Sequence, residues 1–384
     1  MIAFTGVEIY SCTIIMVKGN NVAIAGSNED FYTPLTMMWY MPATDRYYAR
    51  ICFGFNMGMN STQGGMNEHG LFVDGNSVAS QGWRSDNSKK NFLGSVIDHV
   101  LASFKDIGEV KEFFRTFNIP GLDAARIPVM DKSGASMIVE WYNGEVVFLE
   151  TGEDYQVATN FIGSEYTNKE KPCWRYNRAV ELLDKQDIYS VNTVREVLDA
   201  THVEGDGSKT LYSFICDLKS GEIFIYNFHD YLHPVKVEFR EEIKKGNRSF
   251  YLADLFEVRS EEYLNFIEDA PLLMLKRFSG NNYRAVLSYG ILKSYYPDVF
   301  NREIGPEILS EYASHLSEEG RMEDSIFFLE RNAKDFPKNP EVHFQLATVL
   351  RKADKNDRAI EEYRKTLELD PGHSDAKKAI NELK

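Results

Sequence analysis

Residues 10–31, YSCTIIMVKGNNVAIAGSNEDF, contain the pattern that decides the fold of the first part of the chain. Apolar side chains dominate residues 10–17 and again residues 22–25, and the residues at 18–20, Lys-Gly-Asn, favour a turn between them. The segment therefore predicts a β-hairpin. Its second arm runs into a polar group at 26–30, Gly-Ser-Asn-Glu-Asp, which makes this hairpin the first place to look for chemistry.

Outward from the hairpin, short strand-like runs alternate with two helical stretches as far as about residue 239. This order of strands, helices, strands, helices and strands predicts an α+β domain with two sheets. The expected strands are 37–41, 49–55, 71–74, 127–130, 136–142, 146–149, 155–159, 211–217 and 223–228, and the expected helices lie in 92–117, 173–185 and 190–200.

The chain after about residue 249 lacks strand patterns and is predicted to be helical. Its last part contains two copies of a 34-residue pattern, with prolines and small or apolar residues at matching offsets. A helix pair of this length needs small residues where its helices touch and a proline where the next helix begins. The pattern resembles the tetratricopeptide repeat, and the alternative is a helical hairpin with coincidental spacing. Since about three stacked repeats are normally needed for stability, we expect the two copies to pack on the helices of 249–300.

The composition indicates a folded protein that does not attract polyanions. With 384 residues the chain exceeds the usual size of one domain, and 43% apolar residues are enough for substantial cores. A net charge of −15 opposes nonspecific binding to nucleic acid and to anionic membranes. No apolar run reaches the roughly 18 to 20 residues that a membrane-spanning helix needs. We therefore expect no nucleic-acid partner and no membrane span.

The sequence predicts neither a disulfide scaffold nor a metal site, and no cofactor. The four cysteines show no Cys-x-x-Cys spacing, and no histidines accompany them at zinc-ligand intervals. His229 and His233 lie four residues apart, but they follow a predicted strand with no third ligand in view, so we interpret them as solvated loop histidines. Packing explains the cysteines in apolar or strand contexts and the aromatic residues on strands: Cys52, Cys173, Cys216, Phe31, Tyr32, Trp39, Tyr40 and Trp83.

The residues around Cys12 resemble the start of a known hydrolase family. Residues 12–15, CTII, followed after the turn by 26–31, GSNEDF, are similar to the opening of the cysteine branch of the N-terminal nucleophile hydrolases. The pattern is that of the choloylglycine hydrolase, penicillin V acylase and isopenicillin-N acyltransferase group. In that group the first strand begins with a catalytic cysteine, which is exposed when the preceding residues are removed.

Further segments match the family in the same order along the chain and extend the resemblance over about residues 12–245. The resemblance implies a four-layer αββα N-terminal nucleophile hydrolase sandwich at 12–248, a helical connector at 249–305 and an all-α tetratricopeptide-like domain at 306–384. Residues 1–11 are then a leader or a propeptide. The protein is extracytoplasmic if they are a leader remnant, and cytoplasmic otherwise. The matching segments are 65–71 (GMNEHGL), 74–76 (DGN), 158–161 (ATNF), 174–178 (WRYNR) and, more loosely, 210–213 (TLYS) with Asp217.

A cysteine at the front of a chain can supply its own base. A thiol attacks an amide carbonyl as the thiolate, and free cysteine has a pKa of about 8.5. The α-amino group titrates at about 7.7 to 8.0, so it can accept the thiol proton and later return it to the leaving amine. Because the nitrogen of Cys12 is an amide while residues 1–11 are attached, we expect the chain to mature at the Ser11–Cys12 bond, by self-cleavage or by a peptidase.

The resemblance assigns roles to further residues of this chain. Asp30 matches the aspartate that holds the α-amino group, and Asn160, with Asn76, matches the asparagines of the oxyanion hole. The alternative for Asp30 is a strand-end cap, for Asn160 a polar strand-end residue, and for Asn76 a turn residue after Gly75.

Arg175 matches an arginine near the nucleophile, a cation suited to keeping the thiol acidic. Arg178, three residues further along the same predicted helix, is the alternative for this role, and a surface arginine is the alternative for either. Ser27 departs from the family, since relatives in the bile-salt and penicillin branch carry arginine there. This puts bile-salt hydrolysis in doubt.

The sequence therefore predicts a hydrolase of linear amide C–N bonds that acts on small N-acyl substrates through a thioester on Cys12. Two alternatives stay open. The chain is an acyltransferase of the isopenicillin-N type, or it is a catalytically inactive acylase-like domain whose repeats bind a protein or peptide partner.

Overall fold

The computed structural model describes residues 12–56, 60–166, 171–205, 208–278, 280–297 and 305–383. The expected leader or propeptide at 1–11 lies outside these residues. Contacts divide the chain into two units, Met1–Tyr263 and Leu264–Lys384. Each unit is described by itself below, and the domain boundaries drawn from the sequence at 248 and 305 stay predictions.

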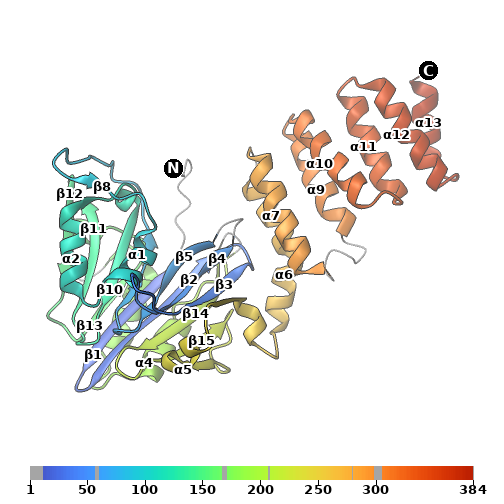
Figure 1. Cartoon of the computed structure of the whole chain (residues 1–384). Helices are drawn as coiled ribbons and strands as arrows, with labels where there is room; N and C mark the ends of the chain where they lie inside the picture. The colour runs from blue at the N-terminus through green and yellow to red at the C-terminus, as the bar shows by residue number, and fades with distance from the viewer. Residues whose placement is uncertain are drawn as a thin grey trace. The chain divides into compact units, whose positions relative to one another are not determined.

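The first sheet of the first unit contains the predicted hairpin, and all of its described strand pairs are antiparallel (Figure 1). Asn21 at the hairpin turn has a φ of 63°, a left-handed conformation that asparagine adopts more readily than most residues. The second strand of the hairpin continues to Phe31, beyond its expected end at residue 25. The strand order is β13 (Tyr155–Ala158), β1 (Thr13–Gly19), β2 (Val22–Phe31), β14 (Lys209–Asp217), β15 (Glu222–Asn227) and β16 (Val235–Glu238).

The second sheet is also antiparallel and includes a strand that the sequence did not predict. Residues 60–67, NSTQGGMN, lack an apolar alternation, yet they pair with strands on both sides. Gly64 is required there, because a Cβ atom on it would lie 2.3 Å from the Asp74 Oδ2. The order is β12 (Glu145–Glu150), β11 (Ser136–Tyr142), β10 (Ala125–Met130), β6 (Phe72–Asp74), β5 (Asn60–Asn67), β4 (Arg50–Asn56), β3 (Thr36–Met41) and β17 (Arg248–Tyr251), and β7 (Asn76–Ser77) also pairs with β10.

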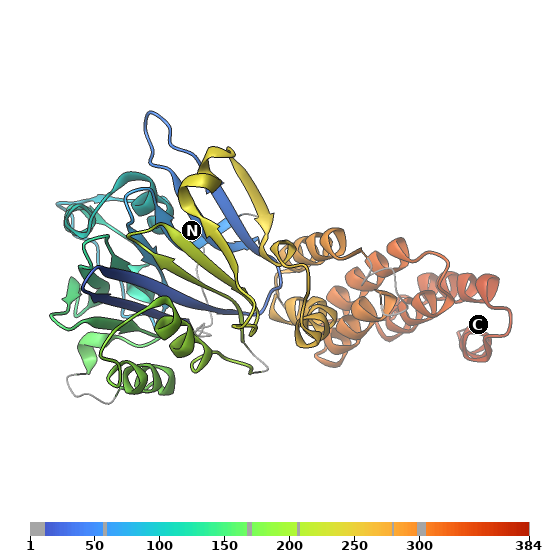
Figure 2. The ribbon, with the colours of Figure 1, turned by 90° about the horizontal axis from the view of Figure 1, so that it is seen from below.

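The two sheets pack face to face, and helices cover their outer faces. Phe53 from the second sheet stacks on Phe214 from the first, with ring centroids 4.2 Å apart. Helices α1 (Val96–Ser103) and α2 (Ile107–Thr116) bury their apolar sides on the second sheet. Helices α3 (Trp174–Leu183) and α4 (Val191–Asp199) do the same on the first sheet, and Figure 2 shows these green helices beside the blue hairpin. The expectation of a domain that combines helices with two sheets is confirmed, and the structure shows that both of these sheets are antiparallel.

The aromatic residues expected in the core are buried, with Trp83 partly buried. The side chains of Phe31, Tyr32, Trp39 and Tyr40 are at most 7% exposed, and Trp83 packs on Trp141 with ring centroids 4.3 Å apart. The remaining described elements of the first unit are β8 (Lys90–Asn91), β9 (Phe117–Asn118), α5 (Phe239–Lys244) and the short 3₁₀ turns η1 (Leu122–Ala124), η2 (Gly163–Glu165) and η3 (Leu252–Leu255).

The second unit is helical, and two of its helix pairs repeat the same local features. Gly320 and Asp354, 34 positions apart, both take a left-handed φ in the turn inside each pair. The small and apolar residues that recur in the sequence are buried in both pairs. Among the described helices, none combines the length and apolar character that crossing a bilayer requires. The bounds are α6 (Glu261–Arg277), α7 (Asn282–Tyr295), α9 (Gly305–Glu318), α10 (Met322–Asp335), α11 (Pro340–Lys352), α12 (Asn356–Leu369) and α13 (Ser374–Glu382).

Candidate active site

Strand order brings the predicted site residues to one end of the first sheet. Cys12 immediately precedes β1, which lies between β13 and β2 and is antiparallel to both. The end of an antiparallel neighbour lies beside the start of the strand it pairs with. Asp30 near the end of β2 and Asn160 after β13 therefore both lie close to Cys12, although Asp30 and Asn160 are 130 residues apart in the chain.

Alternation along β2 sends neighbouring polar side chains to opposite faces of the sheet. Asn28 faces the helices, since its Nδ2 donates to the Leu198 carbonyl at 2.8 Å. Glu29 faces the second sheet, where its carboxyl group interacts with that of Asp74. Asp30 faces the start of α3, where Arg175 lies. Consecutive residues of β2 thus contact the helices on one face of the first sheet and the second sheet on the other face.

The Cys12 sulfur lies against the Glu29 carboxyl group. Sγ and Oε2 are 3.7 Å apart, and the Ser27 hydroxyl donates to Glu29 Oε1 at 2.6 Å. Cys12 is 6% exposed and Glu29 is fully buried. Burial, followed by the charges of Glu29 and Asp30, raises the pKa of the Cys12 thiol well above its usual range. In this form the sulfur is a buried, protonated thiol.

Glu29 and Asp74 form a buried carboxyl pair that links the two sheets. Burial raises the pKa of Glu29 to about 7, while hydrogen bonds from Ser27 and Asp74 act in the opposite direction. Burial and the charge of Glu29 raise the pKa of Asp74 well above its usual range. The two carboxyl groups therefore titrate as a pair and hold a proton that separate, exposed carboxyl groups would release. Like-charge carboxyl groups in one buried site retain a proton for this reason.

Asp30 is held by a hydroxyl group and a guanidinium group. The Thr210 hydroxyl donates to its Oδ1, and Arg175 Nη1 lies 3.6 Å from its Oδ2. Burial raises the pKa of the Asp30 carboxyl well above its usual range, and Arg175 and Thr210 counteract only part of this. Three buried carboxyl groups therefore surround Cys12, and Arg175 is the cation that contacts one of them.

Arg175 and Arg178 occupy different environments. Arg175 is 5% exposed, and its Nη1 donates to the Cys12 carbonyl oxygen at 2.8 Å and to the Thr13 hydroxyl at 3.0 Å. Arg178 points to the surface, where it pairs with Glu181 at 2.8 Å. The structure thus brings Arg175, and not Arg178, to Cys12.

The structure, in which Cys12 follows an intact chain, does not show the expected lowering of the Cys12 thiol pKa by Arg175. We expected this cation to keep the thiol acidic, but its guanidinium group bonds to the carbonyl of Cys12 instead of the sulfur. Burial and the neighbouring carboxyl groups dominate the sulfur's surroundings and raise its pKa.

Both predicted oxyanion-hole asparagines lie in the same network, with their amide groups already bonded. Asn76 Nδ2 donates to the Cys12 carbonyl oxygen at 3.1 Å. Asn160 Nδ2 donates to the Ser77 carbonyl oxygen at 2.8 Å, and its Oδ1 accepts from Arg175 Nη2 at 3.0 Å. A substrate oxyanion would have to share or replace these acceptors.

Glu29, Asp74, Ser27 and Thr210 belong to this site, although sequence reasoning gave them no role in it. The Ser27 hydroxyl donates to Glu29 at 2.6 Å. The available signal was two consecutive acidic residues within a strand of small and apolar residues. This local pattern does not identify Asp74 as the partner of Glu29, because Asp74 belongs to the other sheet.

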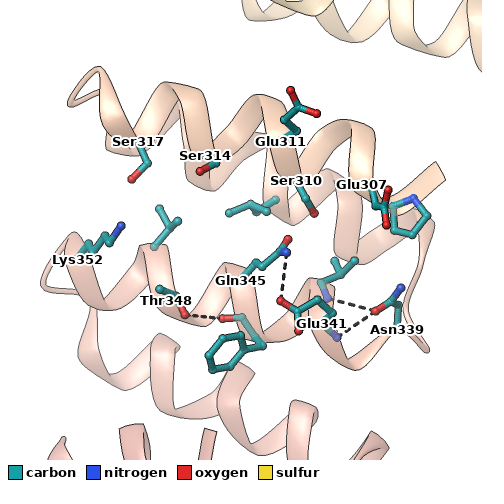
Figure 3. A pocket seen from close by; sticks show the side chains of 15 residues that line it. Glu307, Ser310, Glu311, Ser314, Ser317, Asn339, Glu341, Gln345, Thr348 and Lys352 are labelled. Carbon is teal, nitrogen blue, oxygen red and sulfur yellow. Dashed lines mark hydrogen bonds between the residues drawn. The ribbon is translucent and has the colours of Figure 1, made fainter. Parts of the chain in front are cut away.

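The second unit contains a separate concave surface, which lies between α9 and α11 (Figure 3). Its volume is about 590 Å³, and apolar side chains line it together with hydroxyl and amide groups. Glu307, Glu311 and Glu341 line it, Lys352 lies at its opposite end (Figure 3), and Glu311 Oε1 lies 3.4 Å from the Lys276 ammonium group. Gln345 Nε2 donates to Glu341 Oε1 at 3.2 Å. We call this surface the acidic groove.

Comparisons with known proteins find solved structures of similar fold, among them an acylase and two variants of a hydrolase. No model of a protein family matches the chain, and no curated protein matches it. Penicillin V acylase from Agrobacterium tumefaciens is 18% identical with a TM-score of 0.47, and the match covers 59% of this chain and 84% of that one. Two variants of conjugated bile acid hydrolase from Clostridium perfringens are 16% identical with TM-scores of 0.48 and 0.47, covering 62% of this chain and 95% of theirs. At these identities and TM-scores the likeness carries no functional argument, so the proposals below rest on the geometry of the site.

Proposed function

We propose that the chain is a hydrolase of linear amide C–N bonds in N-acyl compounds and that Cys12 is its nucleophile. The observation that carries this proposal is a single buried network around Cys12. Its carbonyl accepts hydrogen bonds from Asn76 and Arg175, and Arg175 in turn contacts Asp30 and Asn160. The five residues that the sequence selected thus meet at one point.

In the proposed reaction the Cys12 sulfur attacks the amide carbonyl carbon of the substrate. The thiol proton passes to the free α-amino group of Cys12, and donors from Asn160 and Asn76 stabilise the oxyanion. The C–N bond breaks as the α-ammonium group returns its proton to the leaving amine. Water then hydrolyses the thioester, which releases the carboxylic acid and restores the thiol.

The carboxyl groups around Cys12 support a free ammonium group at this position. A buried ammonium group is stable only when it is paired with acidic partners. Glu29, Asp30 and Asp74 are buried at Cys12, and the guanidinium of Arg175 balances one of them. Cutting the Ser11–Cys12 bond would add a second positive charge to this cluster, and we propose that Asp30 then interacts with both the new ammonium group and Arg175.

Glu29 is the base we propose for self-cleavage, before the α-amino group exists. It lies 3.7 Å from the sulfur, and its pKa of about 7 lets it accept a proton at neutral pH. The sulfur then attacks the Ser11 carbonyl carbon, the C–N bond to Cys12 breaks, and the nitrogen takes up the proton. Water hydrolyses the resulting thioester at Ser11.

The experiment is turnover of a panel of N-acyl amino acids and penicillin V by the purified chain, with intact-mass analysis of each preparation. Cys12→Ala is expected to abolish turnover and to retain residues 1–11. Cys173→Ala is the control, because that half-buried cysteine makes no capping hydrogen bond at the start of α3. Unchanged turnover in Cys12→Ala contradicts the proposed nucleophile, and a fully active chain that keeps residues 1–11 contradicts the proposed maturation.

Acyl transfer differs from hydrolysis only in the group that resolves the thioester. Thioester trapping with and without an added amine acceptor distinguishes them. An acyltransferase gives the new amide in preference to the acid, whereas the proposed hydrolase gives the acid at an unchanged rate.

We propose a second function for the second unit, which is binding of a basic peptide in the acidic groove. The excess of carboxylates over ammonium groups in its lining supports such a partner. A fluorescent lysine-rich peptide is expected to bind the full chain and to lose binding in the double variant Glu307→Lys, Glu311→Lys. Cys12→Ala is expected to bind it normally, and equal binding by all three proteins refutes the groove as the site.

A further inference from the structure

Three potential metal ligands from distant segments meet beside β14. His202 and Glu204 follow α4, and His229 follows β15. One ligand atom from each residue lies within 4.8 Å of the others. The sequence shows no third ligand near His229 and His233, whereas the fold brings His202 and Glu204, from the segment just before β14, to His229.

The backbone fixes both segments in this arrangement. The Val203 amide donates to the Thr210 hydroxyl oxygen, and the Thr210 amide donates to the Val203 carbonyl, both at 2.8 Å. These bonds hold the His202–Glu204 segment against β14. Phe228 has a φ of 55°, which is uncommon for a bulky residue and sets the direction of His229.

His202 uses one ring nitrogen to bond to the backbone. Its Nδ1 contacts the Asp199 carbonyl oxygen, which leaves Nε2 facing Glu204 Oε1 at 2.7 Å. His229 Nε2 is buried with no hydrogen-bond partner among the described residues. Metal-ligating histidines typically donate their second ring N–H to a backbone carbonyl in this way, which orients the other nitrogen toward the metal.

From this geometry we propose that His202, Glu204 and His229 bind a zinc ion. Two imidazole nitrogens and one carboxylate oxygen are a known ligand set for Zn²⁺, and water completes the tetrahedral shell. The nearby Lys209 ammonium group bonds to the Glu204 backbone carbonyl at 3.1 Å and leaves the carboxylate available.

The proposed zinc ion has a structural role that reaches the candidate active site. It joins the segment after α4 to the segment after β15, and Thr210 lies directly between the first of these and Asp30. Zinc is therefore expected to stabilise the position of the Thr210 hydroxyl that holds Asp30. The binding itself does not depend on the amide chemistry proposed for Cys12.

The experiment is calorimetric titration of the tag-free, chelator-treated full chain with ZnCl₂, with MgCl₂ as a parallel probe. We expect one zinc equivalent with a dissociation constant in the micromolar range or below, and no stoichiometric magnesium binding, since Mg²⁺ prefers oxygen ligands. The double variant His202→Ala, His229→Ala is expected to lose this equivalent. His233→Ala is the matched control, because His233 is exposed and pairs with Asp230 instead of the cluster.

Glu204→Gln provides a test that leaves the two half-buried histidines unchanged. Glu204 is exposed, so its replacement is expected to keep the fold and to weaken zinc binding at least 10-fold. Circular dichroism checks the fold of every variant. Absence of a zinc equivalent in the wild type overturns the proposal, as does unchanged affinity in Glu204→Gln.

Discussion

Replacing Glu29 with glutamine tests whether a buried, protonated carboxyl group lies beside Cys12. Glutamine keeps the shape of the side chain. Its oxygen can accept from Ser27, and its nitrogen can donate to Asp74, so the local packing is preserved. The comparison is best made in Cys12→Ala chains that intact-mass analysis shows to retain residues 1–11, since their residue 12 has an amide nitrogen and no α-ammonium group.

The expected size of the effect follows from the pKa of Glu29. Burial raises it from 4.5 to about 7 in the folded chain. Between these two pH values the folded state binds a proton that the unfolded state has released, so the free energy of unfolding falls as pH rises. A shift of this size corresponds to about 3 kcal/mol. Because glutamine does not titrate, Glu29→Gln lacks this pH-dependent loss of stability. The free energy of unfolding of Glu29→Gln minus that of its parent should therefore increase by about 3 kcal/mol from pH 4.5 to pH 8.

Tryptophan fluorescence during urea unfolding measures this difference in the first unit alone. The four tryptophans, Trp39, Trp83, Trp141 and Trp174, all belong to that unit. Glu145→Gln, an exposed substitution on β12, is the control and should show no pH-dependent difference. If Glu29→Gln and its parent lose stability in parallel as pH rises, Glu29 is not the protonated group that we describe.

Three further predictions concern residues of the same network. Asn160→Ala should lower kcat about 10²- to 10³-fold on any N-acyl substrate that the enzyme turns over, and an unchanged kcat would remove Asn160 from the oxyanion hole. Arg175→Gln leaves Asp30 buried without its cation and should lower the free energy of unfolding at pH 7 by about 3 kcal/mol or more; the surface variant Arg178→Gln should stay within about 0.5 kcal/mol of the wild type in the same urea experiment. Gly64→Ala places a Cβ atom 2.3 Å from Asp74 Oδ2 and should cost about 1 to 3 kcal/mol in thermal or urea unfolding. Gly152→Ala, which enters open space, should cost little, and equal effects of the two substitutions would show that Gly64 is not packed against Asp74.

Local patterns predicted the elements that depend on neighbouring residues in the chain. The hairpin of β1 and β2 is an example, because its turn and its apolar arms are adjacent. The helix pairs of the second unit are another, since their periodicity lies within each pair. By contrast, β5 has glycines and polar residues where a strand pattern needs alternating apolar ones, and it is a strand because β4 and β6 pair with it.

The contacts of the candidate site could not be predicted from local patterns either, because they join segments that are distant in the chain. The resemblance to a family selected Asp30 and Arg175, but residue types alone do not reveal that a guanidinium group reaches the Cys12 carbonyl instead of its sulfur. The Glu29–Asp74 pair depends on two sheets packing together. Likewise, His229 meets His202 and Glu204 only after β14 has paired with its neighbours.

The two hydrogen bonds to the Cys12 carbonyl would hold residue 12 in place after hydrolysis of the peptide bond that precedes it. New chain ends usually fray, because nothing restrains the first residue. Here Asn76 and Arg175 anchor that residue from its carboxyl side, and β1 continues into a sheet at once. A freshly created terminus would therefore remain in register, with its nitrogen kept among acidic neighbours and not released into solvent.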